Sequence, residues 1–281
     1  MSGPGEVSVS GLLAWAQAEL GAHSEARTDA MVLLESLVGI SRASVYARPD
    51  HALTSCQVLE FKAAIDRRCT GEPVAYIVGE RAFHELNLQV DHHVLVPRPE
   101  TELIVDEVLE LAPALAFTLL DLGVGSGALA LAIAHARRDA RVTAVDVSID
   151  ALTVAAANAA ALGINVEFIE SNWFADLPVQ AFDFIVCNPP YVRSQDAHMQ
   201  ALRFEPQLAL DGGIDGLDSI RAVLADAPGF LRRGGRLLLE HGYDQASAVA
   251  GIAAQSGMLV ERVLIDLAGH QRVTIMSRAD D

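Results

Sequence analysis

The sequence predicts an α/β protein in which a small helical domain precedes a doubly wound, Rossmann-like sheet. From residue 117 onward, short apolar segments alternate with helical ones, an arrangement that gives a parallel sheet with helices on both faces. A glycine-rich turn, DLGVGSG at residues 121–127, lies between the first of these segments and its helix. Residues 8–70, in contrast, carry apolar side chains at helical spacing. These three observations together predict the fold class.

Residues 1–73 are predicted to form the helical domain. Ser10 is placed as the N-cap of its first helix. Thr54 followed by Gln57 resembles a capping box that opens a later helix. Pro73 lies where that helix has to end, because proline cannot continue it.

Two further parts follow the helical domain. Residues 74–96 alternate loosely between apolar and polar side chains, which predicts a β-hairpin linker. Residues 97–281 form the sheet domain, and this part begins with a helix. Pro99 suits the first turn of that helix, and the acidic Glu100 and Glu102 favour its positive end.

The sheet domain is expected to contain seven strands and, after its opening helix, three further long helices. Strands are predicted at residues 117–123, 141–148, 165–171, 182–188, 235–242, 258–267 and 271–277, and helices at residues 125–137, 151–162 and 218–231. The last two strands are too close in sequence for a helical crossover. One of them should therefore run antiparallel to the rest of the sheet.

The net charge of the chain limits the classes of partner that it is expected to bind. Its 37 acidic and 20 basic residues give a formal net charge of -17, which repels a nucleic acid backbone, so no nucleic acid partner is expected. Cys56, Cys69 and Cys187 lack CxxC spacing and are typical of free thiols in a reducing compartment. Neither a signal peptide nor an apolar segment of membrane-spanning length is visible. We expect a soluble, cytoplasmic monomer.

The glycine-rich turn and the next strand predict a cofactor site. Gly123, Val124, Gly125, Ser126 and Gly127 connect a strand to a helix, and glycines there let the backbone turn sharply and approach a ligand. The acid of TAVDVS, at position 146, ends the following strand, where it can accept both hydroxyls of a ribose. The spacing fits NAD as well as S-adenosylmethionine.

The NPPY segment separates these two cofactors. It follows the strand at 182–188, so Asn188 should reach the same sheet edge as the glycine turn. An amide or amino nitrogen is a poor nucleophile because its lone pair is delocalised. The Asn188 oxygen and the Pro189 carbonyl could grip its N–H groups, while Pro190 stiffens the loop and Tyr191 stacks on the planar group. The segment therefore predicts methyl transfer to a planar nitrogen, with Asn188, Pro189 and Tyr191 as the catalytic set.

DLGVGSG, AVD and NPPY, in this order, resemble a class I S-adenosylmethionine-dependent methyltransferase. The segments VPRPETE (96–102), SNWF (171–174), RFEPQLAL (203–210) and LLLEHG (237–242) are similar to the HemK/PrmC family. That resemblance covers nearly the whole chain. It implies N5-methylation of the glutamine in the Gly-Gly-Gln motif of class 1 peptide chain release factors, with the helical domain recognising the substrate.

The resemblance also implies roles for single residues. The glycine turn would line the methionine part of S-adenosylmethionine, Asp146 would hold the ribose, and Trp173 would flank the adenine. Asn188 would lie beside both cofactor and substrate. No metal is implied, and the pair His92 and His93 lacks further ligands at metal spacing.

The residues from Asn188 to Tyr191 would hold the substrate glutamine. Arg98, Glu102 and Arg203 are assigned to substrate binding by the same resemblance, although an Arg–Glu pair that braces a loop is an equal alternative for Arg98 and Glu102. Arg203 with Glu205 could likewise form a structural salt bridge. His241 is expected to be packed or hydrogen-bonded at a strand end rather than catalytic.

Two other functions fit parts of the pattern. An adenine-N6 nucleic-acid methyltransferase would share NPPY, but it should carry a basic groove and a target-recognition insertion. A non-catalytic cofactor-binding module on the translation machinery should have a damaged NPPY or glycine turn. The acidic chain and its intact motifs favour the protein glutamine methyltransferase.

Overall fold

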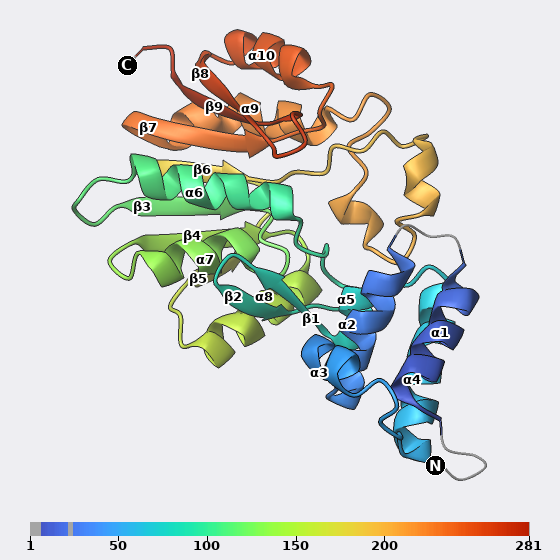
Figure 1. Cartoon of the computed structure of the whole chain (residues 1–281). Helices are drawn as coiled ribbons and strands as arrows, with labels where there is room; N and C mark the ends of the chain where they lie inside the picture. Colours follow the sequence, from blue (N-terminus) through green and yellow to red (C-terminus); the bar gives the residue numbers. More distant parts are fainter. Residues whose placement is uncertain (1–6, 22–24, 281) are drawn as a thin grey trace. The chain divides into compact units, whose positions relative to one another are not determined.

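The computed structural model describes residues 7–21 and 25–280. The chain divides into two compact units between Glu80 and Arg81, and both units are drawn in Figure 1. Each unit has its own hydrophobic core.

The first unit is helical, as the apolar spacing predicts. Its helices are α1 (Val9–Leu20), α2 (Ala26–Val38), α3 (Arg42–Ala47), α4 (Ser55–Cys69) and α5 (Val74–Val78). Their core includes Leu12, Leu34, Phe61 and Ile65, all of which are almost completely buried. A packed core of this kind stabilises helices that would be marginal in isolation.

The caps of this unit differ in one place from the prediction. Ser8, not Ser10, is the N-cap of α1, and its hydroxyl accepts a hydrogen bond from the N–H of Gly11. The prediction was wrong because Ser10 already lies inside the first turn. The capping box of Thr54 and Gln57 is confirmed at the start of α4.

The linker region is only partly a hairpin. Residues 74–78 form helix α5 instead, with Pro73 at its N-cap position. The hairpin consists of β1 (Glu80–Phe83) and β2 (Leu86–Gln89). The apolar side chains of β2, Leu86 and Leu88, are buried in the hydrophobic core of the second unit.

Within residues 81–280, seven strands form one sheet in the order β5-β4-β3-β6-β7-β9-β8 (Figure 1). Their bounds are β3 (Thr118–Leu122), β4 (Arg141–Asp146), β5 (Glu167–Glu170), β6 (Phe182–Cys187), β7 (Leu231–Glu240), β8 (Met258–Ile265) and β9 (Gln271–Arg278). The first five pair in parallel, whereas β9 runs antiparallel to both β7 and β8. The predicted antiparallel final strand is confirmed.

Helices cover both faces of this sheet. Helices α6 (Glu102–Leu111), α7 (Ala128–Ala136) and α8 (Ile149–Leu162) contribute to the core on one face. Helices α9 (Asp218–Phe230) and α10 (Ala246–Gln255) pack into the core on the other face. Helix α10 was not predicted. Pro99 begins a short 3-10 turn, η1 (Pro99–Thr101), directly before α6.

The order of the strands determines where a ligand can bind. The chain runs from β3 outward through β4 to β5 and then returns to the other side of β3 with β6. The direction of winding therefore changes beside β3. In open sheets of this type, ligands bind at the carboxyl ends of the strands next to such a switch point. The glycine turn, Asp146 and Asn188 all lie at those ends.

Among the described residues, none of the helices has both the length and the apolar character needed to cross a membrane.

Candidate active site

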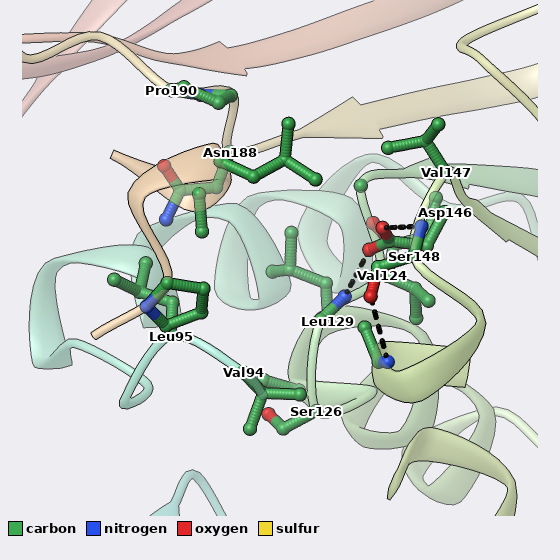
Figure 2. Close-up of a pocket in the computed structure, with 18 of the residues that line it drawn as sticks. Val94, Leu95, Val124, Ser126, Leu129, Asp146, Val147, Ser148, Asn188 and Pro190 are labelled. Atoms are coloured by element: carbon green, nitrogen blue, oxygen red, sulfur yellow. Dashed lines mark hydrogen bonds between the residues drawn. The ribbon is translucent and has the colours of Figure 1, made fainter. Parts of the chain in front are cut away.

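A pocket of about 270 Å³ lies in the sheet domain at the carboxyl ends of β3, β4 and β6. Figure 2 shows Asn188 and Pro190 on one side of this pocket and Asp146 with Ser148 on the other. The predicted residues that line it are Arg98, Gly123, Val124, Gly125, Ser126, Asp146, Trp173, Asn188 and Pro190. The topology therefore brings together three motifs that are far apart in the sequence.

The glycine turn is held by backbone hydrogen bonds to the neighbouring strand β4. The N–H groups of Gly123 and Val124 both donate to the carbonyl of Val145 in β4, each at 2.9 Å. Gly127 has φ of +90° and occupies the N-cap of α7, where a Cβ would lie 2.7 Å from a methyl carbon of Leu131. Gly127 does not line the pocket but shapes the turn that does. The glycine there is required by both conformation and space.

Asp146 connects the glycine turn to the next helix. One carboxylate oxygen accepts from the N–H of Gly125 at 3.0 Å, and the other accepts from the N–H of Ser148 at 2.9 Å (Figure 2). Burial raises the pKa of this carboxyl, and the backbone hydrogen bonds act in the opposite direction. Each carboxylate oxygen has a second lone pair that can accept from a ligand hydroxyl.

A second acid in the pocket was not selected from the sequence. Asp121 is 1% exposed, and its Oδ2 accepts from the N–H of Ala130 at 3.0 Å. Its Oδ1 has no hydrogen-bond partner among the described residues. Burial raises its pKa to about 7. An acid within the otherwise apolar strand FTLLDLG was the signal that could have revealed it, because a buried carboxyl requires a partner.

Trp173 lines the pocket from the segment after β5. Its φ of 54° is rare for a residue other than glycine. The hydroxyl of Ser171 donates to its carbonyl at 2.9 Å, which helps to fix this conformation. A half-buried indole held in this way offers an apolar face to a planar ligand.

The NPPY segment is anchored by two residues that the sequence did not single out. The Asn188 Nδ2 donates to the hydroxyl oxygen of Thr101 at 3.1 Å, and this hydroxyl donates to Glu240 Oε2 at 2.7 Å. The Tyr191 hydroxyl donates to Glu240 Oε1 at 3.1 Å. Pro189 is buried, and neither it nor Tyr191 lines the pocket. One carboxylate thus supports both ends of NPPY.

The titration of this group follows from its burial. Glu240 is 1% exposed, and burial raises its pKa to about 7. Burial also raises the pKa of Tyr191 far above its ordinary value, with the charge of Glu240 acting in the same direction. The Tyr191 phenol therefore stays neutral at physiological pH and cannot act as a base there.

Of the predicted substrate residues Arg98, Glu102 and Arg203, only Arg98 lines the pocket. Arg98 lines the pocket and lies 2.5 Å from Glu205, whose other oxygen accepts from the N–H of Val96 at 3.1 Å. Glu102 accepts from the N–H of His84 at 3.0 Å and does not line the pocket. The Arg203 guanidinium lies 4.9 Å from the ring of Phe204, also outside the lining. Substrate contacts by Glu102 and Arg203 stay predictions.

Two histidine features lie near the site. His241 is buried, with one ring nitrogen 2.8 Å from the Gly242 carbonyl and the other 2.9 Å from the Thr274 hydroxyl. This packed position at the end of β7 agrees with the expectation.

His92 and His93 offer ligand atoms that, with Asp91, lie within 4.8 Å of one another. An oxygen of Asp91 already accepts from the backbone N–H of His93.

Two protein families match segments of the chain. The PrmC N-terminal domain matches residues 11–79, and the methyltransferase small domain matches residues 100–204. Similarity to individual relatives extends over most of the length of the chain. The release factor glutamine methyltransferase of Yersinia pestis is 41% identical over 90% of this chain and 93% of its own. Those of Xylella fastidiosa strain Temecula1 and Pseudomonas aeruginosa are 44% and 43% identical, each over 89% of this chain and 92% of their own.

Solved structures of methyltransferases share the fold. A methyltransferase from Pyrococcus furiosus superposes with a TM-score of 0.54 at 19% identity, covering 70% of this chain and 91% of its own. The ribosomal protein L11 methylase of Lactobacillus delbrueckii subsp. bulgaricus gives a TM-score of 0.52 at 20% identity, covering 68% and 84%. The predicted class I methyltransferase fold is confirmed by these similarities.

Proposed function

The chain belongs to the family of release factor glutamine methyltransferases, and we propose that it transfers a methyl group from S-adenosylmethionine to the N5 nitrogen of the Gly-Gly-Gln glutamine in class 1 release factors. One observation carries the proposal beyond the similarity. A single pocket joins the glycine turn and Asp146, which suit a nucleoside cofactor, to Asn188, which suits an amide.

The pocket residues fit S-adenosylmethionine in both charge and shape. The unpartnered buried oxygen of Asp121 suits an ammonium group. Asp146 retains acceptor capacity for the ribose hydroxyls, and the half-buried Trp173 offers a face to the adenine. When bound, the cofactor supplies an electrophilic methyl group on a sulfonium. The glycine turn, Asp121, Asp146 and Trp173 would hold it in a fixed position beside Asn188.

The chain's own residues act by holding the acceptor amide. The Asn188 carbonyl oxygen and the backbone carbonyl of Pro189 accept the two N–H bonds of the substrate glutamine, which orients its nitrogen and increases electron density there. Pro189 and Pro190 restrict the loop that presents both acceptors. The methylated nitrogen is strongly acidic and loses its extra proton without a dedicated base. The neutral Tyr191 agrees with a mechanism of this kind.

The first unit is the proposed recognition domain for the release factor. It exposes apolar side chains, among them Leu59 at 69%. Leu59→Asp is expected to raise KM for an intact release factor by about tenfold, which corresponds to ~1.4 kcal/mol. Leu259→Asp, at a similarly exposed position in β8, is the matched control and should leave KM unchanged. Equal effects of both substitutions would contradict this role.

Methyl transfer itself is tested with labelled S-adenosylmethionine and three acceptors. These are a class 1 release factor, the same factor with Gln→Ala in its Gly-Gly-Gln motif, and adenine-rich DNA. Label should appear only on the unchanged factor. Label on the DNA, or on the Gln→Ala factor at the same level, would overturn the proposed substrate.

A further inference from the structure

We propose that Glu240, acting through Thr101, fixes the orientation of the Asn188 amide so that its carbonyl oxygen faces the substrate. Thr101 and Glu240 are then positioning residues for methyl transfer. This inference rests on the proposed function, because it assigns a supporting network to the amide-binding Asn188. The three side chains come from η1, from the loop directly after β6 and from β7, and they meet only in the folded chain.

The hydrogen bonds from Asn188 to Thr101 and from Thr101 to Glu240 form a relay. The number of protons in this relay determines the orientation of the Asn188 amide. A threonine hydroxyl has one proton, and a carboxylate has none. The short 2.7 Å contact directs the Thr101 proton to Glu240. Toward Asn188, Thr101 therefore presents only a lone pair. The amide atom that faces it at 3.1 Å must be the nitrogen, and the planar amide then turns its oxygen away from Thr101.

A reversed Asn188 amide would make two unfavourable contacts, one with Thr101 and one with the substrate. Its oxygen would face the Thr101 oxygen with no proton between them, leaving two acceptors in contact. Its NH₂ group would face the NH₂ group of the substrate glutamine, so two donors would meet in the site. The relay therefore selects the only amide orientation in which both neighbours of Asn188 receive a complementary atom.

The second oxygen of Glu240 strengthens this selection. It accepts from the Tyr191 hydroxyl at 3.1 Å, so the carboxylate holds both ends of NPPY. Within the described part of the chain, the charged or titratable groups whose charges act on Glu240 or are affected by it include, besides Tyr191, Arg272 from β9, Glu100 from η1 and Cys187 from β6. Burying a carboxyl is unfavourable unless it is well hydrogen-bonded. A buried carboxylate that holds both Thr101 and Tyr191 directly behind the amide-binding residue indicates a role in positioning.

The protonation state of Glu240 should matter for the same reason. A protonated carboxyl can donate to Thr101, which frees the Thr101 proton to turn toward Asn188 and removes the selection. Burial raises the pKa of Glu240 to about 7. Arg272 lowers this pKa and Glu100 raises it, and neither cancels the effect of burial. The turnover number should therefore fall as the pH decreases through about 7.

Thr101→Val tests the relay because valine keeps the shape of threonine without its hydroxyl. We expect kcat to fall 10- to 100-fold, while the Kd for S-adenosylmethionine changes less than threefold. Thr101→Ser restores the hydroxyl and should recover kcat to within threefold of the unchanged enzyme. Thr143→Val is the matched control, because the Thr143 hydroxyl also donates to a glutamate, Glu167, but outside the pocket. Its kcat should be unchanged.

Glu240→Gln is a second test of the positioning role, and it remains informative if Thr101→Val folds poorly. Glutamine has one acceptor oxygen and cannot accept from both Thr101 and Tyr191, so kcat should be reduced. Because the titrating group is gone, kcat should also no longer fall between pH 8 and pH 6. A role in stability alone would lower the melting temperature of both variants without changing kcat of the folded enzyme or the shape of the pH profile. That outcome would overturn the inference.

A measurement without turnover separates this inference from the proposed function. In enzyme labelled with ¹⁵N-asparagine, the hydrogen-bonded side-chain proton of Asn188 should have a shifted resonance that Thr101→Val abolishes and Thr101→Ser retains. If these resonances behave as expected but no label reaches a release factor, the substrate assignment fails and the relay stands. If labelling succeeds and Thr101→Val leaves kcat and the resonance unchanged, the relay fails.

Discussion

The Arg98 guanidinium lies 2.5 Å from the carboxylate of Glu205, whose side chain is only 3% exposed. This ion pair joins the segment before η1 to the segment after β6, and Arg98 also lines the pocket. The sequence left open whether Arg98 binds substrate or braces a loop. The geometry shows the bracing contact.

Arg98→Met should destabilise the protein. It removes the ion-pair partner of a buried carboxylate that also accepts from the Val96 N–H, a loss of about 3 kcal/mol in the free energy of unfolding. Urea unfolding measures this change. The double variant with Glu205→Gln should recover part of the loss, because the unpaired charge is gone. Unchanged stability together with a raised KM for the release factor would instead assign Arg98 to substrate binding.

Asp146→Ala should weaken cofactor binding. The substitution removes the proposed acceptor for the ribose and the contacts that hold Gly125 and Ser148. Hydrogen bonds to charged groups contribute about 1.5–3 kcal/mol, so the Kd for S-adenosylmethionine should rise by roughly 10- to 100-fold. Calorimetric titration measures it. Asp150→Ala, an exposed acid in the first turn of α8, is the control and should keep the original affinity.

Stability should depend on pH through two buried acids. Burial raises the pKa of Asp121 from 3.8 and that of Glu240 from 4.5, each to about 7. Between the unfolded and folded pKa values, the folded state binds more protons than the unfolded state. The contribution of these groups to stability is therefore lost as the pH rises toward 7, by an amount on the order of 3 kcal/mol for each group.

The variants Asp121→Asn and Glu240→Gln isolate this contribution. His241 acts in the opposite direction, since burial lowers its pKa, so each variant is compared with the unchanged protein. Unfolding free energies at pH 5 and pH 8 should differ less in each variant than in the unchanged protein. Equal differences in all three proteins would show that neither acid titrates as inferred.

The sequence predicted those parts of the site that depend on local chain geometry. The glycine turn, Asp146 and Asn188 each follow a strand directly, and parallel strands bring their carboxyl ends to one edge. Helix α10 was missed because it lacks the usual start signal: its N-cap is Gln245, which makes no side-chain cap hydrogen bond, and Gly251 interrupts its sequence. Ser10 was preferred to Ser8 because both residues suit an N-cap and the first turn is hard to locate from spacing alone.

Thr101, Glu240 and Asp121 were missed for a different reason. The position of Glu240 depends on the register of two strands, in which Cys187 pairs with Leu239 and thus brings Glu240 level with Asn188. Hydrophobic patterns do not contain that register. Thr101 lies within VPRPETE, but only the folded chain shows that it bridges Asn188 and Glu240. The supporting residues of a site are therefore harder to predict than the residues that contact a ligand.

Gly127→Ala should lower stability more than an ordinary glycine substitution. Its Cβ would meet Leu131, a fully buried residue, and its φ of +90° is strained for alanine. Conformational strain and overpacking together should lower the free energy of unfolding by about 2–4 kcal/mol. Gly163→Ala is the control, since that glycine also has a positive φ but open space around its Cβ position. Its loss should be only about 1 kcal/mol. Equal losses would contradict a steric role for Gly127.

Asn188→Ala should separate catalysis from cofactor binding. The substitution removes one of the two acceptors that hold the substrate amide, while Asp146 and the glycine turn stay intact. Loss of one such group at a reacting centre typically lowers kcat by about 10²–10³-fold. The Kd for S-adenosylmethionine should change by less than about threefold, well below one hydrogen bond to a charged group.

Asn188→Asp sharpens the same test. Aspartate keeps an oxygen toward the substrate but places a second oxygen against Thr101, which already donates its proton to Glu240. It should therefore bind S-adenosylmethionine but turn over slowly, even though the acceptor atom is present. Single-turnover methylation and equilibrium binding measure the two quantities separately. If both variants lost cofactor affinity in proportion to activity, Asn188 would belong to the cofactor site, and the glutamine amide would have to be held by other residues.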